Sequence, residues 1–405
     1  MKIIHFAIVV TLWSGVLGYD YHCSKRSALL LLKRPAYEFS IKMLQRVTED
    51  TDSHFVYSPL STWLQVTALA EGATGSTLRE IWNVTKHHRN RCFKKKLSEI
   101  LETLNSELRY ESKRKSVMAV DRLIRVKKSY MRAVQKLYGI KVMQLDFNEP
   151  KKSADKVNKA IEDGTGRVID TIVYYDDFID STLVMSDANY FRTEWETPFN
   201  SAYTQLKPFY SNRGVKQVYL MNQIGYYHYV HMPQIHAKVL EIPCATRRIS
   251  MLIFMPTQKE WIGEIFYSLQ NTSLTGIFNM YKKNRKQLIN LTMPVFSQQT
   301  EIINIPELLY DMGIKKIFNP DIAEFKTVSN YKMHASLMTQ VTDIEVNEKG
   351  LTVETAAALV NNDTVTDFLV DRPFAYMIVD KITEFILYAG VYSIPGEVGT
   401  EMNNV

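Results

Sequence analysis

The strongest constraint on this fold lies near the C-terminus, where two apolar runs flank a short turn. FAYMIVD (374–380) and EFILYAGVYSI (384–394) carry apolar residues on both alternating faces and are separated by a few residues. Strands of that kind are buried on both sides, and a short separation predicts that they pair as a hairpin. We therefore expect a buried hairpin inside a hydrophobic core large enough to cover it.

Upstream of the hairpin, the patterning changes from helical to strand-like. Helical spacing predicts helices over 34–47, 58–73, 76–82, 93–108, 129–139, 151–166 and 305–318. Ser58 is a natural N-cap for the second, with Pro59 in its first turn. Short β-branched or aromatic runs predict strands over 117–126, 181–191, 224–232, 237–243, 249–256 and 288–296. No Pro/Gly/Ser-rich linker or repeat intervenes, so we expect one large α+β domain over residues 19–405.

The N-terminal residues 1–18, MKIIHFAIVVTLWSGVLG, have the layout of a secretory signal peptide. One Lys precedes an apolar run that ends in a small residue, with cleavage expected after Gly18. The alternative is a membrane anchor, but the run is shorter than the ~20 apolar residues a spanning helix needs. No later stretch is long or apolar enough, so we expect a secreted, extracellular protein without a membrane segment.

Cysteines and histidines give no support to metal, cofactor or enzyme chemistry. The chain has three cysteines, Cys23, Cys92 and Cys244. An odd number cannot pair fully, so we expect no disulfide framework, and the pairing stays open. His228 and His231 would face opposite sides of a strand, and the adjacent His87 and His88 are expected to be solvated. Without a nucleophile motif or phosphate loop, we expect no catalytic residues, metal site or cofactor.

Basic residues concentrate in KHHRNRCFKKK (86–96) and KKNRK (282–286), within a chain of net charge +6. Such clusters attract polyanions, and on a secretory route the polyanion is a glycosaminoglycan rather than nucleic acid. We therefore expect Lys94, Lys95 and Lys96, at the start of a predicted helix, to contact a sulfated polyanion. The alternative is an ordinary solvated helix start and loop.

Candidate N-glycosylation sequons occur at Asn83, Asn271, Asn290 and Asn362. In a secreted chain each marks a surface position that could carry a glycan. Asn290 lies in a strand-like run, so its use is the least certain of the four.

A series of motifs follows in order along the chain. They are FVYSPLSTWLQVTALAEGATGSTLREI (55–81), SDANYFRTEWETPF (186–199), SMLIFMP (250–256), MGIKKIFN (312–319), IEVNEKG (344–350) and FLVDRPFAYMIVD (368–380). Together they resemble the serpin family of serine protease inhibitors, over about residues 34–395. The resemblance implies the serpin fold, a single large domain with helices around three β-sheets and an exposed reactive loop at about 350–368. We expect a monomer.

The resemblance also implies a mechanism for the reactive loop. In serpins a protease takes this loop as substrate, and after cleavage its first half inserts into the main sheet as a new strand, dragging the acyl-enzyme along. The loop hinge here comprises Gly350, Leu351, Thr352, Val353, Glu354, Thr355 and Ala356. Inhibitory members usually have small side chains soon after the glycine, whereas this chain has bulky Leu351 and Val353. Overpacking an inserted strand costs about 1–3 kcal/mol per site.

Four polar residues resemble the serpin cluster beneath the sheet where it parts. Ser58 and Ser61 match the family directly, whereas Asp187 stands where it usually has Asn, and Gln340 where it usually has His. A carboxylate accepts hydrogen bonds and a Gln amide can donate them, so the two changes could compensate by pairing. The alternative is that they do not touch. Trp195 resembles the family's Trp at the upper end of this sheet, and it also fits a core aromatic.

The family's loop length places the scissile bond at Thr364–Val365, only a few residues before Phe368. The bait residues around it suit neither trypsin-like nor chymotrypsin-like proteases, and a glycan at Asn362 would obstruct docking. The sequence therefore predicts a secreted protein of the serine endopeptidase inhibitor class that is weakly inhibitory or non-inhibitory. The alternative is a functional suicide-substrate inhibitor of an extracellular elastase-like serine protease. The divergent hinge resembles that of secreted insect serpins.

Overall fold

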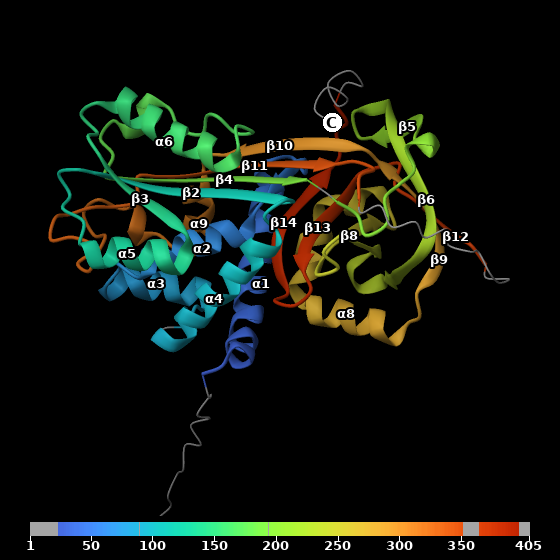
Figure 1. Cartoon of the computed structure of the whole chain (residues 1–405), viewed down its shortest axis with the longest axis horizontal. Helices are drawn as coiled ribbons and strands as arrows, with labels where there is room; N and C mark the ends of the chain where they lie inside the picture. Colours follow the sequence, from blue (N-terminus) through green and yellow to red (C-terminus); the bar gives the residue numbers. More distant parts are fainter. Residues whose placement is uncertain (1–22, 89, 193, 351–363, 397–405) are drawn as a thin grey trace, which may run out of the picture.

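The computed structural model describes residues 23–88, 90–192, 194–350 and 364–396 (Figure 1). The helices are α1 (Lys25–Asp50), α2 (Pro59–Ala70), α3 (Gly75–Thr85), α4 (Arg91–Glu107), α5 (Lys128–Tyr138), α6 (Pro150–Thr165), α7 (Ile265–Ser268), α8 (Leu274–Lys283) and α9 (Ile305–Asp311). α2 is central, because every one of its residues is buried. As predicted, Ser58 is its N-cap and Pro59 its first residue; the Ser58 side chain accepts a hydrogen bond from the Ser61 amide.

The predicted C-terminal hairpin is confirmed. β13 (Phe374–Asp380) pairs antiparallel with β14 (Phe385–Tyr392), and every residue of both strands is buried. They lie in a nine-stranded sheet with the order β1-β14-β13-β8-β7-β6-β9-β12, to which β5 adds beside β6. The other strands are β1 (Phe55–Tyr57), β5 (Gln205–Ser211), β6 (Gly214–Met232), β7 (Ala237–Pro243), β8 (Ile249–Pro256), β9 (Gln287–Pro294) and β12 (Thr366–Leu369).

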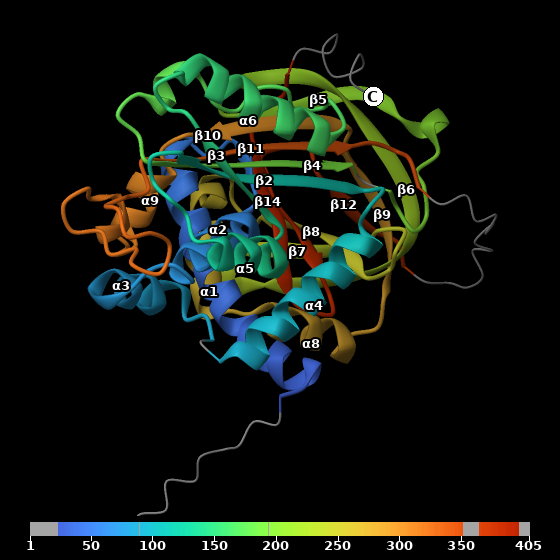
Figure 2. The ribbon, with the colours of Figure 1, turned by 60° about the vertical axis from the view of Figure 1, so that its left-hand side comes forward.

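A second sheet has five strands in the order β10-β11-β4-β2-β3. They are β10 (Phe296–Ile302), β11 (Leu337–Val346), β4 (Leu183–Arg192), β2 (Ser112–Asp121) and β3 (Ile140–Leu145). Figure 2 shows α6 lying across one face of this sheet, with α2 and its neighbouring helices on the other. Because the long strand β6 pairs with β9 and β5 at one end and with β7 at the other, two of the three expected sheets merge into one path.

Several local predictions need correction. The helix predicted over 305–318 ends at Asp311, because Gly313 takes a left-handed φ of 102° and only a 3₁₀ turn follows at Lys316–Phe318. The strand-like run over 288–296 is divided between β9 and β10. The predicted elements did not include α8 or the strands β3, β5 and β11, although Leu274, Ile277 and Tyr281 of α8 are buried at helical spacing. Of the predicted solvated histidines, His87 is 5% exposed, and its Nδ1 hydrogen-bonds the Thr85 hydroxyl.

A disulfide joins Cys23 to Cys92, whereas Cys244 is a buried free thiol. The expectation that no disulfide framework holds this fold is therefore wrong for this one bond. The bond ties the start of α1 to the start of α4, across a sequence separation of 69 residues. Closing a loop of this length removes entropy from the unfolded chain.

We predict that Cys92→Ser lowers the free energy of unfolding by about 2–4 kcal/mol, the usual contribution of a native disulfide. Denaturant titration with and without a reductant measures it. Reductant should lower the midpoint of the wild type and leave Cys92→Ser unchanged. Cys244→Ser is the control, because it keeps the disulfide and must stay sensitive to reductant. A wild type indifferent to reductant would contradict the prediction.

Candidate functional site

The candidate site is the seam between β4 and β11, the two parallel strands at the middle of the five-stranded sheet. Their register runs from Val184 paired with Leu337 to Arg192 paired with Glu345. β2 and β10 flank them on the outer sides. The seam is thus closed along its length, and a strand could enter only if β4 and β11 separated.

The first turn of α2 is bonded to both sides of the seam. On the β11 side, Gln340 makes two bonds to the Ser58 backbone: the Ser58 amide donates to Oε1 at 2.7 Å, and Nε2 donates to the carbonyl at 3.1 Å. On the β4 side, the Ser61 hydroxyl donates to Asn189 Oδ1 at 2.9 Å. Between them the Ser58 hydroxyl donates to Ser61 Oγ and to the Leu387 carbonyl of β14. Parting the strands must break one of these attachments.

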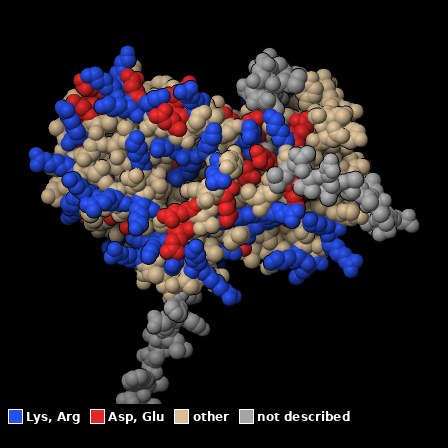
Figure 3. All heavy atoms as spheres, in the orientation of Figure 1, with Lys and Arg blue, Asp and Glu red and all other residues tan. Residues whose placement is uncertain are grey.

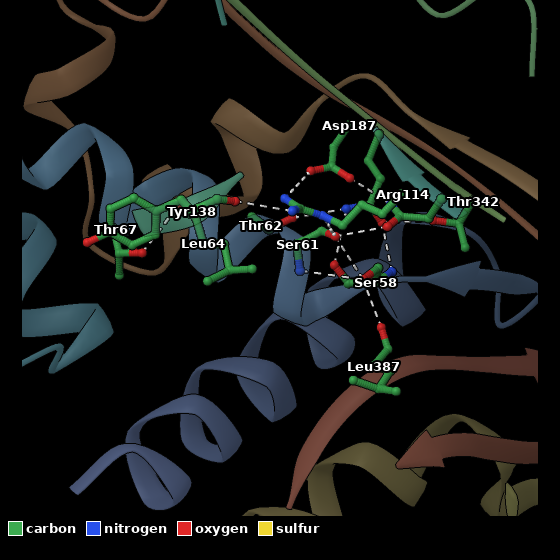
Figure 4. Close-up of polar contacts among 12 residues, drawn as sticks. Ser58, Ser61, Thr62, Leu64, Thr67, Arg114, Tyr138, Asp187, Thr342 and Leu387 are labelled. Atoms are coloured by element: carbon green, nitrogen blue, oxygen red, sulfur yellow. Dashed lines mark hydrogen bonds and ion pairs between the residues drawn. The ribbon is translucent and has the colours of Figure 1, made fainter. Parts of the chain in front are cut away.

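An ion pair braces the β4 side (Figure 4). Arg114 reaches in from β2, where Nη2 lies 2.7 Å from Asp187 Oδ2 and Nε donates to Ser61 Oγ at 2.8 Å. The Asn189 amide donates to the other carboxylate oxygen of Asp187 at 2.9 Å. Asp187 is fully buried. Burial raises its pKa above the ordinary value, and the Arg114 guanidinium opposes that shift.

All four residues of the predicted polar cluster therefore meet beneath the seam. Asp187 and Gln340 are register neighbours, but the compensating pair that their types suggested does not form. Asp187 takes its hydrogen bonds from Arg114 and Asn189, and Gln340 bonds to α2 and Thr342. Arg114 and Asn189 were missed from the sequence. Two features of the sequence could have identified Arg114. A buried carboxylate needs a cation nearby, and the basic residues of SKRK (112–115) directly precede the apolar part of β2.

The opposite face of the seam carries a further link. The Tyr190 hydroxyl on β4 donates to Glu345 Oε2 on β11 at 2.7 Å. Asp343 lies on the same face, in register with Tyr190. Burial raises the pKa of Asp343 to about 6, and the neighbouring Glu345 charge adds to the shift. Above that pH the strand carries a poorly solvated charge at the seam.

Trp195 closes the upper end of the seam, where it is fully buried. Its indole Nε1 donates to the Asn347 carbonyl at 2.6 Å, and its amide donates to the Lys349 carbonyl at 3.0 Å. Trp195 also forms a parallel bridge with Gly350, where a Cβ would lie 2.4 Å from the Trp195 carbonyl oxygen. Glycine is thus required by close backbone approach at the position predicted to begin the hinge.

The loop that begins here has its far end on the other sheet. Hinge residues 351–356 and Asn362 lie outside the described residues. Thr364 and Val365, the predicted scissile pair, are exposed, and β12 follows at Thr366, paired parallel with β9. Gly350 thus lies at the upper end of the seam, whereas Thr366 begins a strand of the other sheet.

The predicted polyanion-binding lysines and glycosylation sites differ in how exposed they are. Lys94 forms an ion pair with Glu71 at 2.7 Å and Lys96 one with Glu99 at 2.9 Å, whereas Lys95 is exposed. Three sequon asparagines have described positions, exposed Asn83 and Asn271 and half-buried Asn290. The amide of Asn290 donates to Asp367. No helix of the described residues is long and apolar enough to cross a membrane.

Fold and seam together define a class of protein: a mixed domain whose central sheet is closed at five strands, with Gly350 at the upper end of the seam and Thr364 and Val365 exposed. The family described as Serpin (serine protease inhibitor) matches residues 35–395, and the chain belongs to the serpin family. Serpins are generally inhibitors of proteases rather than enzymes.

Relatives support the same conclusion. Human Serpin B4 is 26% identical over 88% of this chain and 98% of its own length. Mouse plasminogen activator inhibitor 1 is 26% identical over 88% of this chain and 90% of its own. Among solved structures, native protease nexin-1 with heparin has a TM-score of 0.82, with 22% identity, over 91% of this chain and 100% of that one. Serpin48 from the insect Tenebrio molitor has a TM-score of 0.78, with 25% identity, over 91% and 99%.

We predict that Asp187→Asn lowers the free energy of unfolding by about 3 kcal/mol, because it leaves the Arg114 guanidinium without a carboxylate in a buried site. Denaturant titration measures this value. The control is Arg114→Met combined with Asp187→Leu, which removes both charges and should cost less than the single change. A double variant as unstable as Asp187→Asn would show that packing, not charge, accounts for the loss.

For Asp343 we predict a pH-dependent difference from Asp343→Asn. The folded-state pKa of about 6 lies above the ordinary aspartate value of 3.8, so protonation favours the fold, and stability is lost as pH rises between these values. Near pH 8 the Asn variant should be more stable than the wild type, and near pH 4 this advantage should vanish. Unfolding midpoints across that range provide the measurement. An advantage that is constant with pH would contradict the raised pKa.

Proposed function

We propose that this serpin is secreted, presents residues 350–368 to an extracellular serine protease, and traps the protease weakly or not at all. The observation that carries the proposal is the attachment of α2 to both sides of the seam. Insertion requires β4 and β11 to part. The first turn of α2 can then stay with β11 through Ser58 and Gln340, or with β4 through Ser61 and Asn189, but not with both.

The free energy needed to break one attachment of α2 slows the insertion of the loop between β4 and β11. Each buried donor or acceptor left without a partner costs about 1–3 kcal/mol, and the Ser61 side of the attachment also satisfies the Arg114 guanidinium. The Tyr190–Glu345 hydrogen bond across the outer face must break as well. Bulky Leu351 and Val353 then enter the sheet in place of small residues. Trapping is a race between insertion and deacylation, and each of these terms favours deacylation.

The alternative is a functional suicide-substrate inhibitor of an elastase-like protease. One observation favours it: Gly350 sits at the upper end of a closed seam, so the residues after it would start in place for antiparallel entry between β4 and β11. Exposed Thr364 and Val365 suit a protease that accepts small or β-branched side chains.

We predict that an elastase-like protease cutting between Asn361 and Thr366 releases mostly nicked protein. Replacing residues 351–355 with Thr-Glu-Ala-Ala-Ala should raise the fraction found as a covalent complex on denaturing electrophoresis, because the hinge then fits the sheet more easily. A matched variant carries the same replacement with Gly350→Ala. It should lose the gain, because the added Cβ meets the Trp195 carbonyl. A wild type that forms covalent complex at near one-to-one stoichiometry would establish the inhibitor instead.

We further propose a sulfated glycosaminoglycan as a partner of the α4 start. Protease nexin-1, a structural neighbour, was crystallised with heparin. Of the three lysines predicted for this role, Lys95 is the one that is exposed and lacks an ion pair among the described residues. Arg91 beside it is exposed too. The KKNRK segment at the end of α8 is a second exposed basic cluster, and Figure 3 shows Lys and Arg gathered over that part of the molecule.

We predict that Lys95→Gln with Arg91→Gln elutes from a heparin column at lower salt than the wild type, because two unpaired cations are lost. Lys94 is left in place, since neutralising it would also break its ion pair with Glu71. Lys283→Gln with Arg285→Gln is the charge-matched control on α8. If only the control elutes early, polyanion binding lies on α8 and the α4 assignment is wrong.

A further inference from the structure

Two adjacent tyrosines, Tyr174 and Tyr175, lie in the segment that connects α6 to β4. Their side chains are 56% and 55% exposed. Neither hydroxyl hydrogen-bonds another described side chain. Both phenol groups are thus open to solvent, and no step of the proposed protease trapping involves them.

Buried residues on both sides of the pair hold this segment in place. Ile172 and Val173 precede the tyrosines and Phe178 follows them, and all three are buried. The Asn158 side chain of α6 donates to the Val173 carbonyl at 2.8 Å. It also accepts from the amides of Ile172 and Val173, at 3.1 and 3.2 Å. The two phenol rings are therefore presented at a fixed place on the surface.

The sequence around the two rings is acidic. Asp176 and Asp177 follow them directly, and Asp170 and Asp180 lie within five residues of Tyr175. Asp170, Asp176 and Asp180 are exposed, and Asp177 is half-buried. Four carboxylates thus surround two exposed phenol groups within one short segment.

No positive charge of the same segment offsets these carboxylates. The sequence has neither Lys nor Arg between Arg167 and Arg192. A further carboxylate lies close by, because burial raises the pKa of Glu301 on β10 and the Asp177 charge adds to that shift. The surface around the tyrosines is therefore negative, and it favours a positively charged partner.

Other tyrosines of the chain are similarly exposed but have different neighbours. Tyr110 is 69% exposed, and the Arg109 guanidinium lies 4.6 Å from its ring centre. Tyr310 is also exposed, and Lys315 Nζ lies 4.3 Å from its ring centre. Tyr203 is 60% exposed and has no acidic residue within five positions. These tyrosines provide internal controls for a modification that depends on acidic neighbours.

We propose that this segment is a site of tyrosine O-sulfation, with Tyr174 and Tyr175 as acceptors and an adenosine phosphosulfate as donor. The phenol oxygen attacks the sulfur atom, and the bond between sulfur and the bridging phosphate oxygen breaks as the new O–S bond forms. The phenol proton passes to a basic group of the transferase, and the adenosine phosphate leaves. A transferase that binds so anionic a donor has a positively charged active site, which the four carboxylates complement.

The proposal rests on the secretory route of the proposed function, and it is independent of protease trapping. The chain recovered from the medium of eukaryotic cells should carry sulfate on its tryptic peptide 168–192. Fragmentation mass spectrometry should place the group on Tyr174, Tyr175 or both, whereas Tyr110 and Tyr203 stay unmodified. A phosphate group has nearly the same mass, so phosphatase must leave the modification in place. Removal by phosphatase, or equal modification of Tyr110 or Tyr203, overturns the proposal.

A second measurement uses the purified full chain with a tyrosylprotein sulfotransferase and labelled donor. Tyr174→Phe with Tyr175→Phe should abolish incorporation of sulfate. Asp176→Asn with Asp180→Asn keeps both acceptors and should lower kcat/KM about tenfold, within the range that electrostatic steering contributes. Asp177 is left in place, because its Oδ2 accepts a hydrogen bond from the Tyr174 amide at 2.7 Å.

Asp155→Asn with Asp163→Asn is the charge-matched control, because both carboxylates are exposed on α6. It should leave kcat/KM unchanged. Equal loss in the two Asn double variants, or no incorporation into the wild type, overturns the proposal. A chain that is absent from the medium but accepts sulfate in the purified reaction would contradict secretion and support the acceptor site, so the two failures are distinguishable.

Discussion

The hydroxyl of Ser61 and the backbone of Ser58 hold the first turn of α2 to both strands of the seam. Since α2 is buried along its whole length, this turn cannot shift without disturbing the core beneath the sheet. Hydrogen bonds from α2 to β4 and β11 therefore stabilise the closed five-stranded sheet, in addition to the pairing of the strands themselves. Strand separation has to overcome side-chain hydrogen bonds in a low-dielectric interior, where unpaired groups are expensive.

The chemistry of the cluster also distributes charge unequally across the seam. Asp187, Arg114 and Asn189 form a set on the β2–β4 side, so a separating β4 could carry its ion pair with it. Gln340 on the β11 side is neutral and satisfied by backbone groups of α2. With Asp187 and Gln340 at these positions, the cluster forms two hydrogen-bonded sets that are linked through Ser58 and Ser61. Trp195 adds a separate closure at the upper end, directly at Gly350, where the predicted reactive loop begins.

Much of the fold could be predicted from local pattern, and the failures have physical causes. The terminal hairpin and most of the long helices have strong periodicity. α9 ends earlier than its apolar spacing indicated, because Gly313 interrupts the helix. The remaining differences involve contacts between residues far apart in the sequence. Arg114 lies far from Asp187 in the sequence, and their pairing exists only because β2 and β4 are antiparallel neighbours. The Cys23–Cys92 bond likewise depends on how α1 and α4 pack. The cluster residues were identifiable through family resemblance, but their partners were not.

The central claim is that Ser61 ties β4 to α2 and thereby keeps the seam closed. Amide hydrogen exchange of the intact protein measures the closure directly, because local opening exposes the backbone bonds of the strands involved. In Ser61→Ala, exchange should accelerate at the amides of β4 and β11, while those of β13 and β14 keep their wild-type rates. Unchanged exchange along the seam, or equal acceleration in the terminal hairpin, would contradict this account.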